Sequence, residues 1–300
     1  MENLLQQLLN GITWGSIYAL IALGYTMVYG VLKLINFAHG EVYMMGAMTG
    51  YYAARLLGLG GEPSVAGLVL VLLVSMGVCG LLGALIERVA YRPLRSAGRL
   101  APLITAIGVS LLLQNGGQLV FGADPKFFPQ LLRSSEVARV GGIALSNIQL
   151  VVLVTAVLLM ATLQFVVQST RFGRAMRAVS YDAPAAALMG VPVDRVILGT
   201  FVLGSMLAAA AGILIGLSNP KIDPLMGLLP GLKAFVAAVL GGIGSVPGAM
   251  VGGLLLGVIE TLVTAYLSST YRDALAFVIL VVILLYRPTG ILGAPQLEKV

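Results

Sequence analysis

Charged residues are scarce in this chain, and their scarcity excludes an ordinary soluble domain. Only 10% of the 300 residues are charged, while 59% are hydrophobic. The mean hydropathy is +1.00. Soluble domains carry about 25% charged residues, so this composition indicates a protein built into a lipid bilayer. The net charge of +6 comes from loops between apolar runs, where basic residues set orientation and do not indicate a nucleic-acid partner.

Residues for metal, redox or nucleotide chemistry are almost absent. One cysteine and one histidine supply neither an internal disulfide nor a convincing set of metal ligands. No G-x-x-x-x-G-K-[ST] segment occurs, so we expect no ATP hydrolysis by this chain alone, and no cofactor. A membrane serine hydrolase would need His39 beside Ser110 or Ser205, and nothing in the spacing brings them together.

Apolar stretches fill the chain from residue 8 to residue 288. Because lipid offers the backbone no hydrogen-bond partners, such stretches must span the bilayer as helices. We predict an all-α, polytopic transmembrane bundle of about eight or nine spans, forming one domain over residues 1–300. The expected spans lie near 8–31, 40–57, 64–87, 101–121, 148–168, 196–217, 230–243, 247–266 and 274–287.

Two of these segments are expected to be interrupted. Segment 230–243 is short and runs into a glycine- and proline-rich stretch at 241–248, which cannot be regular helix throughout. We expect a half-helix and a turn there, and a similar break at 36–40. Irregular backbone inside a membrane is tolerated where it lines a cavity.

Arginine clusters predict the orientation. Residues 88–99 and 171–195 each hold four arginines, and basic loops stay in the cytoplasm. With nine spans the N-terminus then lies outside and the C-terminus inside. The segment 122–147 is expected to be an external loop.

Polar residues within or beside the spans are the candidates for a translocation pathway, because such residues are costly in lipid and usually face the bundle interior. An ordinary structural role competes in each case: capping for His39, snorkelling for Lys233, and a packing hydrogen bond for Glu260 and for the amides of the fourth span. We expect Glu41 to be an ordinary carboxylate at a helix start. The candidates are Asn36, His39, Gln114, Asn115, Lys233, Gly241, Gly242 and Glu260.

The segment most unlike its surroundings is 170–195, which we expect to be cytoplasmic. Asp182 can cap a helix, Pro184 suits its first turn, and Gly190 can end it in a left-handed conformation. The resulting helix of about two turns is too short to span a membrane. It would present Leu188 and Met189 either to a docking partner or to the membrane interface, and the preceding arginines suit anionic lipid or an acidic partner.

Seven segments, taken in order, resemble the permease subunits of bacterial high-affinity importers for branched-chain amino acids, which belong to the ATP-binding cassette (ABC) class. Any one segment is a weak signal, but the ordered set covers essentially the whole chain. The matching segments are Asn36–Met44, Glu87–Arg95, Thr105–Ser110, Thr170–Arg177, Leu188–Val191, Gly231–Ala249 and Arg287–Ile291.

The resemblance implies a type II-like importer permease in the bacterial inner membrane. It implies a second related permease, two cytoplasmic ATPase subunits and a periplasmic binding protein as partners. Related importers carry an E-A-A-x-x-x-G coupling pattern; here Pro184 stands at the glutamate position, and Asp182 could supply the acidic contact. The coupling residues implied are Asp182, Ala185, Ala186, Leu188, Met189 and Gly190.

Other cargoes and mechanisms remain open at this stage. Related permeases handle urea or short amides, and an ion-coupled secondary transporter would also contain broken helices. Such a transporter needs an intramembrane carboxylate to carry the ion, and Glu260 is the one that the sequence places well. The resemblance assigns no substrate-binding residue.

Overall fold

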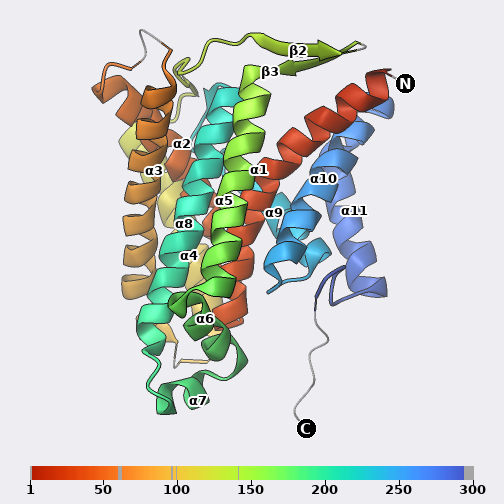
Figure 1. Cartoon of the computed structure of the whole chain (residues 1–300). Helices are drawn as coiled ribbons and strands as arrows, with labels where there is room; N and C mark the ends of the chain where they lie inside the picture. Colours follow the sequence, from red (N-terminus) through yellow and green to blue (C-terminus); the bar gives the residue numbers. More distant parts are fainter. Residues whose placement is uncertain (1, 60–62, 96, 99, 141, 294–300) are drawn as a thin grey trace.

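The computed structural model describes residues 2–59, 63–95, 97–98, 100–140 and 142–293, and this part of the chain is a helical bundle (Figure 1). The predicted all-α class is therefore confirmed. A π-helical turn and a 3₁₀ turn, Glu87–Tyr91 and Arg92–Leu94, continue α3. The α-helices are α1 (Glu2–Leu32), α2 (His39–Leu56), α3 (Val65–Ile86), α4 (Leu100–Phe121), α5 (Asn147–Ser169), α6 (Arg171–Tyr181), α7 (Ala183–Leu188), α8 (Val193–Ser218), α9 (Leu228–Gly241), α10 (Val246–Tyr266) and α11 (Tyr271–Tyr286).

Each of the nine predicted spans coincides with a helix, but not all of these helices are of full spanning length. Among the described residues, six helices are long and apolar enough to cross a membrane: α1, α3 (with its continuation), α4, α5, α8 and α10. α9 has 14 residues and α11 has 16. At 1.5 Å per residue α9 covers about 21 Å, less than the ~30 Å hydrocarbon core. The half-helix predicted at 230–243 is thus confirmed.

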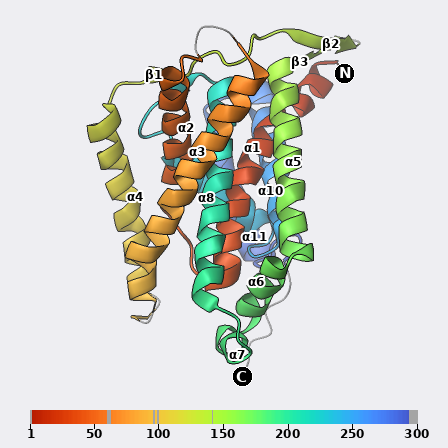
Figure 2. The ribbon, with the colours of Figure 1, turned by 60° about the vertical axis from the view of Figure 1, so that its left-hand side comes forward.

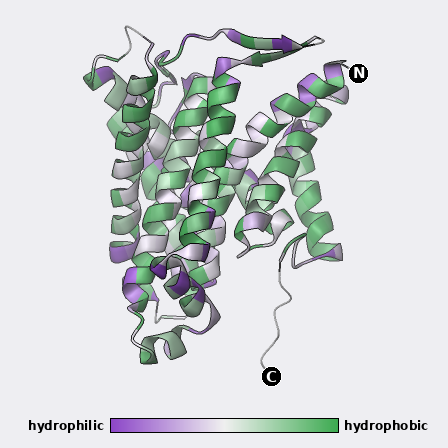
Figure 3. Cartoon of the chain, viewed as in Figure 1, coloured by the Kyte–Doolittle hydropathy of each residue, from purple (hydrophilic) through white to green (hydrophobic). Residues whose placement is uncertain are grey.

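The two ends of the bundle differ in the way that the arginine clusters predict. The start of α1 and the hairpin of β2 (Glu136–Val140) and β3 (Ile143–Ser146) lie at one end, while α6 and α7 lie at the other (Figure 1). Hydrophilic residues gather at both ends and hydrophobic ones between them (Figure 3). We call the end with α7 the inner end and the end with the hairpin the outer end; that assignment stays a prediction.

The segment 122–147 is more ordered than the loop that the sequence suggests. It contains the antiparallel β2–β3 hairpin, and β1 (Lys126–Phe127) pairs with β4 (Lys221–Ile222). Both small sheets lie at the outer end, where α4 and α8 end and α5 begins.

Small residues let α1 and α10 pack with their backbones close together. A Cβ added at Gly15 would stand 2.7 Å from the Leu254 Cα, and one added at Gly253 would collide with Ala19. Without bulky side chains between them, two backbones approach closely and gain dispersion energy, the main source of helix association in lipid. α1 and α10 therefore pack backbone to backbone where these glycines lie.

The helices at the side of the bundle leave much of their surface uncovered by the rest of the chain. The α1 and α8 spans are 78% and 72% buried, whereas the α4 span is 17% buried. α4 stands at the side of the bundle, apart from α8 and α10 (Figure 2). Its apolar residues suit contact with lipid or with another subunit.

α2 begins deep inside the bundle, after the predicted break. α1 ends at Leu32 and α2 starts at His39, with Lys33 in a left-handed conformation (φ 56°) between them. The His39 ring lies against Gly24, eight residues before the end of α1. Eight residues correspond to about 12 Å of helix, so the chain has turned back into the bundle before α2 begins.

Candidate coupling and translocation sites

The coupling segment has the local structure that its sequence predicts. The Asp182 Oδ1 accepts a hydrogen bond from the Ala185 N–H at 2.9 Å and caps α7, with Pro184 in the first turn. Gly190 has φ +83° and ends the helix. Its N–H donates to the Ala187 carbonyl at 3.0 Å, and the Val191 N–H donates to the Ala186 carbonyl at 3.0 Å. The left-handed turn thus satisfies the last carbonyls of α7.

α7 presents two large apolar side chains at the tip of the inner end (Figure 1). Leu188 is 89% exposed and Met189 is 84% exposed, whereas Ala186 is buried toward the bundle. Ala185 is exposed on the surface of α7 that faces away from the bundle. Exposed apolar residues outside the membrane mark a surface that another protein can cover.

α6 ties the coupling segment firmly to the spans. The Ser180 hydroxyl donates a hydrogen bond to the Gly30 carbonyl of α1 at 2.5 Å. Phe172 fills the space beside Gly199 of α8, and Met176 is buried. α6 is therefore packed and hydrogen-bonded against the inner ends of α1 and α8.

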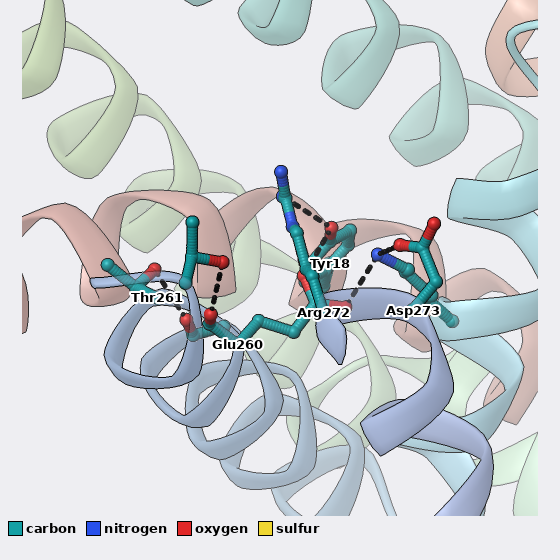
Figure 4. Close-up of polar contacts among 8 residues, drawn as sticks. Tyr18, Glu260, Thr261, Arg272 and Asp273 are labelled. Atoms are coloured by element: carbon teal, nitrogen blue, oxygen red, sulfur yellow. Dashed lines mark hydrogen bonds and ion pairs between the residues drawn. The ribbon is translucent and has the colours of Figure 1, made fainter. Parts of the chain in front are cut away.

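A cluster of four charged residues, of which Lys233 and Glu260 are buried, joins α9, α10 and α11 (Figure 4). The Lys233 Nζ lies 2.7 Å from the Glu260 Oε1 and 2.6 Å from the Asp273 Oδ1. The Arg272 Nε donates to the Glu260 Oε2 at 3.1 Å. The Tyr18 hydroxyl of α1 donates to the same oxygen at 2.9 Å. Two cations and two carboxylates make the cluster formally neutral.

This cluster explains how Lys233 and Glu260 are tolerated in the bundle. Their side chains are 5% and 1% exposed, and a buried ion is stable only when it is paired and hydrogen-bonded. Lys233 does not snorkel to an interface, so that sequence interpretation is wrong. Glu260 already has cationic partners in Lys233 and Arg272, so it does not offer an empty carboxylate for a coupling ion.

Two adjoining cavities lie next to the charged cluster. One, of about 370 Å³, is lined by charged and polar residues that include Tyr18, Lys233, Arg272, Asp273, Asn219, Lys221 and Asp223. The other, of about 610 Å³, reaches the outer end. Trp14, Ile17 and Arg272 line both, and the Arg272 guanidinium lies 5.2 Å from the centre of the Trp14 ring. Cavities of this size accommodate small organic solutes.

Comparison with known proteins decides the family. The family described as "branched-chain amino acid transport system / permease component" matches residues 7–284. This chain belongs to that family. The permease is 48% identical over 300 residues to the high-affinity branched-chain amino acid transport system permease protein BraD of Pseudomonas aeruginosa, covering 99% of this chain and 98% of BraD.

Other relatives extend the same match. The permease is 46% identical over 306 residues to LivH of Escherichia coli K12, covering 99% and 97% of the two chains. It is 29% identical over 297 residues to a probable LivH of Methanocaldococcus jannaschii, covering 94% and 90%. These relatives are membrane transport permeases and not enzymes. The resemblance stated from the sequence is therefore confirmed.

The structure gives the polar candidates near the first break structural partners. The Asn36 Oδ1 accepts hydrogen bonds from the Tyr91 hydroxyl at 2.9 Å and from the Ala38 N–H at 3.1 Å. The His39 ring packs edge-on against Tyr25 with 4.8 Å between ring centres. A role for Asn36 and His39 in translocation stays a prediction.

The remaining candidates fall in different places. Gln114 points inward and donates to the Glu41 Oε1 at 2.6 Å, whereas Asn115 is exposed and donates to the Leu111 carbonyl of its own helix. Gly241 and Gly242 are buried at the inner end, where Gly241 meets the backbone of Gly248 and Gly242 meets that of residues 289–293. These glycines permit close backbone packing, and none of the cavities described above includes them.

Sequence reasoning missed three important residues. Arg272 and Asp273 complete the charged cluster, yet their sequence position indicates only boundary charges at the start of a span. Glu41 is 1% exposed in the bundle interior, although the sequence predicts an ordinary helix-start carboxylate. One signal was available for Glu41: Ser110 and Gln114 lie four residues apart on one face of their helix, and two polar groups so placed favour a polar partner opposite.

Proposed function

We propose that this permease forms one half of an ATP-driven importer for branched-chain amino acids. A binding protein delivers the amino acid at the outer end, a second related permease completes the pathway, and two ATPase subunits bind at the inner end. The observation that carries the proposal is the 46–48% identity, over nearly the whole length, to permeases named for branched-chain amino acid transport. The lack of a phosphate-binding motif fits a chain that relies on separate ATPases.

In this proposal α7 docks into a groove of an ATPase subunit. Leu188 and Met189 provide the apolar area that such a short helix needs, since a few buried side chains carry most of the energy of an interface. Asp182 and Gly190 fix the two ends of the helix. Ala185 and Ala186 have small side chains, which allow the helix to approach the groove closely. Pro184 replaces the glutamate of the usual pattern, so the contact is more apolar than in the related importers.

The same anchoring supports a route from ATP to the membrane. Closure of the ATPases would move α7 and α6, and the Ser180–Gly30 hydrogen bond joins α6 to the last turn of α1. The break at residues 33–38 follows immediately. Hinges of a few irregular residues absorb such displacements.

The test compares Leu188→Asp with Leu188→Met in the complete importer. Asp places a charge in an apolar contact at a cost of several kcal/mol, whereas Met keeps the apolar area. We expect Leu188→Asp to abolish ATP hydrolysis stimulated by the loaded binding protein, and to reduce recovery of the ATPase subunits in a pull-down. Leu188→Met should behave like the wild type. Normal stimulation and recovery in Leu188→Asp would rule out α7 as the coupling helix.

Cargo is tested with the same complex in proteoliposomes. We expect ATP-dependent accumulation of leucine, isoleucine and valine, and no accumulation of urea or acetamide. A proton or sodium gradient without ATP should drive no uptake. Accumulation driven by a gradient alone would contradict the proposal.

A further inference from the structure

Two helices begin at the same point in the interior of the permease. α2 starts at His39 and α9 starts at Leu228. A Cβ added at Gly40 would stand 2.6 Å from the Gly227 carbonyl oxygen and 3.0 Å from the Gly231 Cα. Glycines at these positions allow the two helix starts to touch. In membrane transporters, discontinuous helices of this kind build solute sites near the middle of the bilayer.

Glu41 lies at this junction with half of its carboxylate unused. Its Oε1 accepts hydrogen bonds from the Gln114 Nε2 at 2.6 Å and from the Ser110 hydroxyl at 3.4 Å. Its Oε2 has no hydrogen-bond partner among the described residues, although the side chain is 1% exposed. An unpartnered buried oxygen is costly, and a donor that reaches it recovers that free energy.

The other buried glutamates of the described chain show what Glu41 lacks. Glu87 is paired with Arg95 at 2.7 Å, and Glu260 is paired with Lys233 and Arg272. None of the ion pairs formed by the described residues includes Glu41. The described bundle therefore supplies a cation to two of its three buried glutamates and leaves the third for a cation from elsewhere.

A cavity of about 70 Å³ faces this carboxylate. A water molecule occupies about 30 Å³ in the liquid, so the cavity accepts a small polar group but not a whole amino acid. Glu41, Ser110 and Tyr25 contribute polar groups to its lining, and Phe37, Leu228 and Leu232 form its apolar part. Leu228 is 51% exposed, so the apolar part continues onto the free surface beside α9.

We propose that Glu41 binds the ammonium group of the transported amino acid. An ammonium group carries three N–H donors and the positive charge that the site lacks. The aliphatic side chain of the amino acid then lies against Phe37, Leu228 and Leu232. Within the described chain no side chain caps the start of α9, and the positive end of its dipole favours the substrate carboxylate. The inference rests on the proposed function, because it takes the cargo to be an amino acid.

The first test uses Glu41→Gln in the complete importer, reconstituted in proteoliposomes with the leucine-loaded binding protein. Gln keeps the size of the side chain but removes the charge. We expect leucine uptake to fall at least tenfold, with stimulated ATP hydrolysis within twofold of wild type. Glu41→Asp, which keeps the charge, should recover part of the uptake. Wild-type uptake in Glu41→Gln would overturn the proposal.

The second test keeps the wild-type protein and so does not depend on the folding of a variant. An apolar carbodiimide modifies buried carboxyl groups, and mass spectrometry measures modification at Glu41 and at Glu87. We expect the leucine-loaded binding protein to slow modification of Glu41 several-fold relative to the empty binding protein, and to leave Glu87 unaffected. Equal rates at Glu41 in the two conditions would overturn the proposal.

The two proposals fail in different ways. If the wild-type importer accumulates no branched-chain amino acid, the proposed function is wrong. If it accumulates leucine while Glu41→Gln does so equally well and Glu41 is unprotected, only the ammonium site is wrong.

Discussion

Removing one of the two buried members of the charged cluster should cost more stability than removing both as a matched pair. In Lys233→Met, Glu260 keeps Arg272 at 3.1 Å but loses the Nζ at 2.7 Å. Breaking a buried ion pair costs about 3–5 kcal/mol. Because Arg272 still compensates Glu260, and Asp273 is 52% exposed, we expect a loss at the lower end of this range, about 3 kcal/mol, in the free energy of unfolding.

The double variant Lys233→Met/Glu260→Met should be more stable than either single variant. It removes one cation and one carboxylate together, and leaves Arg272 and Asp273, which both reach solvent in part. Replacing a whole buried pair by apolar side chains is often nearly neutral, so we expect a loss of about 1 kcal/mol or less relative to the wild type. The two substitutions are therefore strongly coupled.

Cys79 provides the assay. It is the only cysteine of the chain and is buried, so a thiol-reactive fluorophore reports unfolding of the purified permease in detergent. Unfolding is followed against denaturant for the wild type, both single variants and the double variant. Wild-type stability in Lys233→Met, or a double variant that loses the sum of the two single losses, would refute the ion-pair account.

Three further predictions concern the turn, the central helix pair and the orientation. Gly190→Val forces a β-branched residue into a left-handed turn at a cost of roughly 1–2 kcal/mol, so stimulated ATP hydrolysis should fall while the permease still inserts; unchanged stimulation would contradict this. Gly15→Leu should separate α1 from α10 and cost about 1–3 kcal/mol or more, visible as reduced yield of folded permease. In a Cys79→Ala background, Glu136→Cys should be labelled by an impermeant reagent from outside intact cells and Ala187→Cys should not, and the reverse labelling would invert the orientation.

Local chemistry made part of this structure predictable. The cap at Asp182 and the stop at Gly190 depend only on residues within one short segment, so the sequence alone specifies α7. The half-helix α9 was also predictable from local features, because the short apolar segment and the glycines that follow it are visible in the sequence. The sequence predicts nine spans, whereas six of the described helices are long and apolar enough to cross a membrane. The difference arises because an apolar segment is recognised by its hydropathy, which does not show whether its helix is long enough to cross the bilayer.

Tertiary contacts set the limits of the sequence interpretation. Lys233 and Glu260 lie on different helices, and their pairing depends on how α9 and α10 cross, which no local pattern specifies. Glu41 was correctly placed at a helix start, yet its burial results from α4 and α9 lying beside it. Asn115 and Gln114 are adjacent in sequence but face different ways, because a helix turns by about 100° per residue.

The end of α9 has a consequence for biosynthesis. Its last carbonyls, those of Leu240 and Gly241, accept hydrogen bonds from the Ile291 and Leu292 N–H groups at 2.9 Å. Lys233 likewise finds Asp273 only after α11 has been made. A nascent chain that has emerged only as far as α9 therefore holds a half-helix with an unpaired cation and open carbonyls. These partners become available only when translation has supplied α11 and the segment after it, so α9 is expected to be among the last parts of the permease to reach its final place.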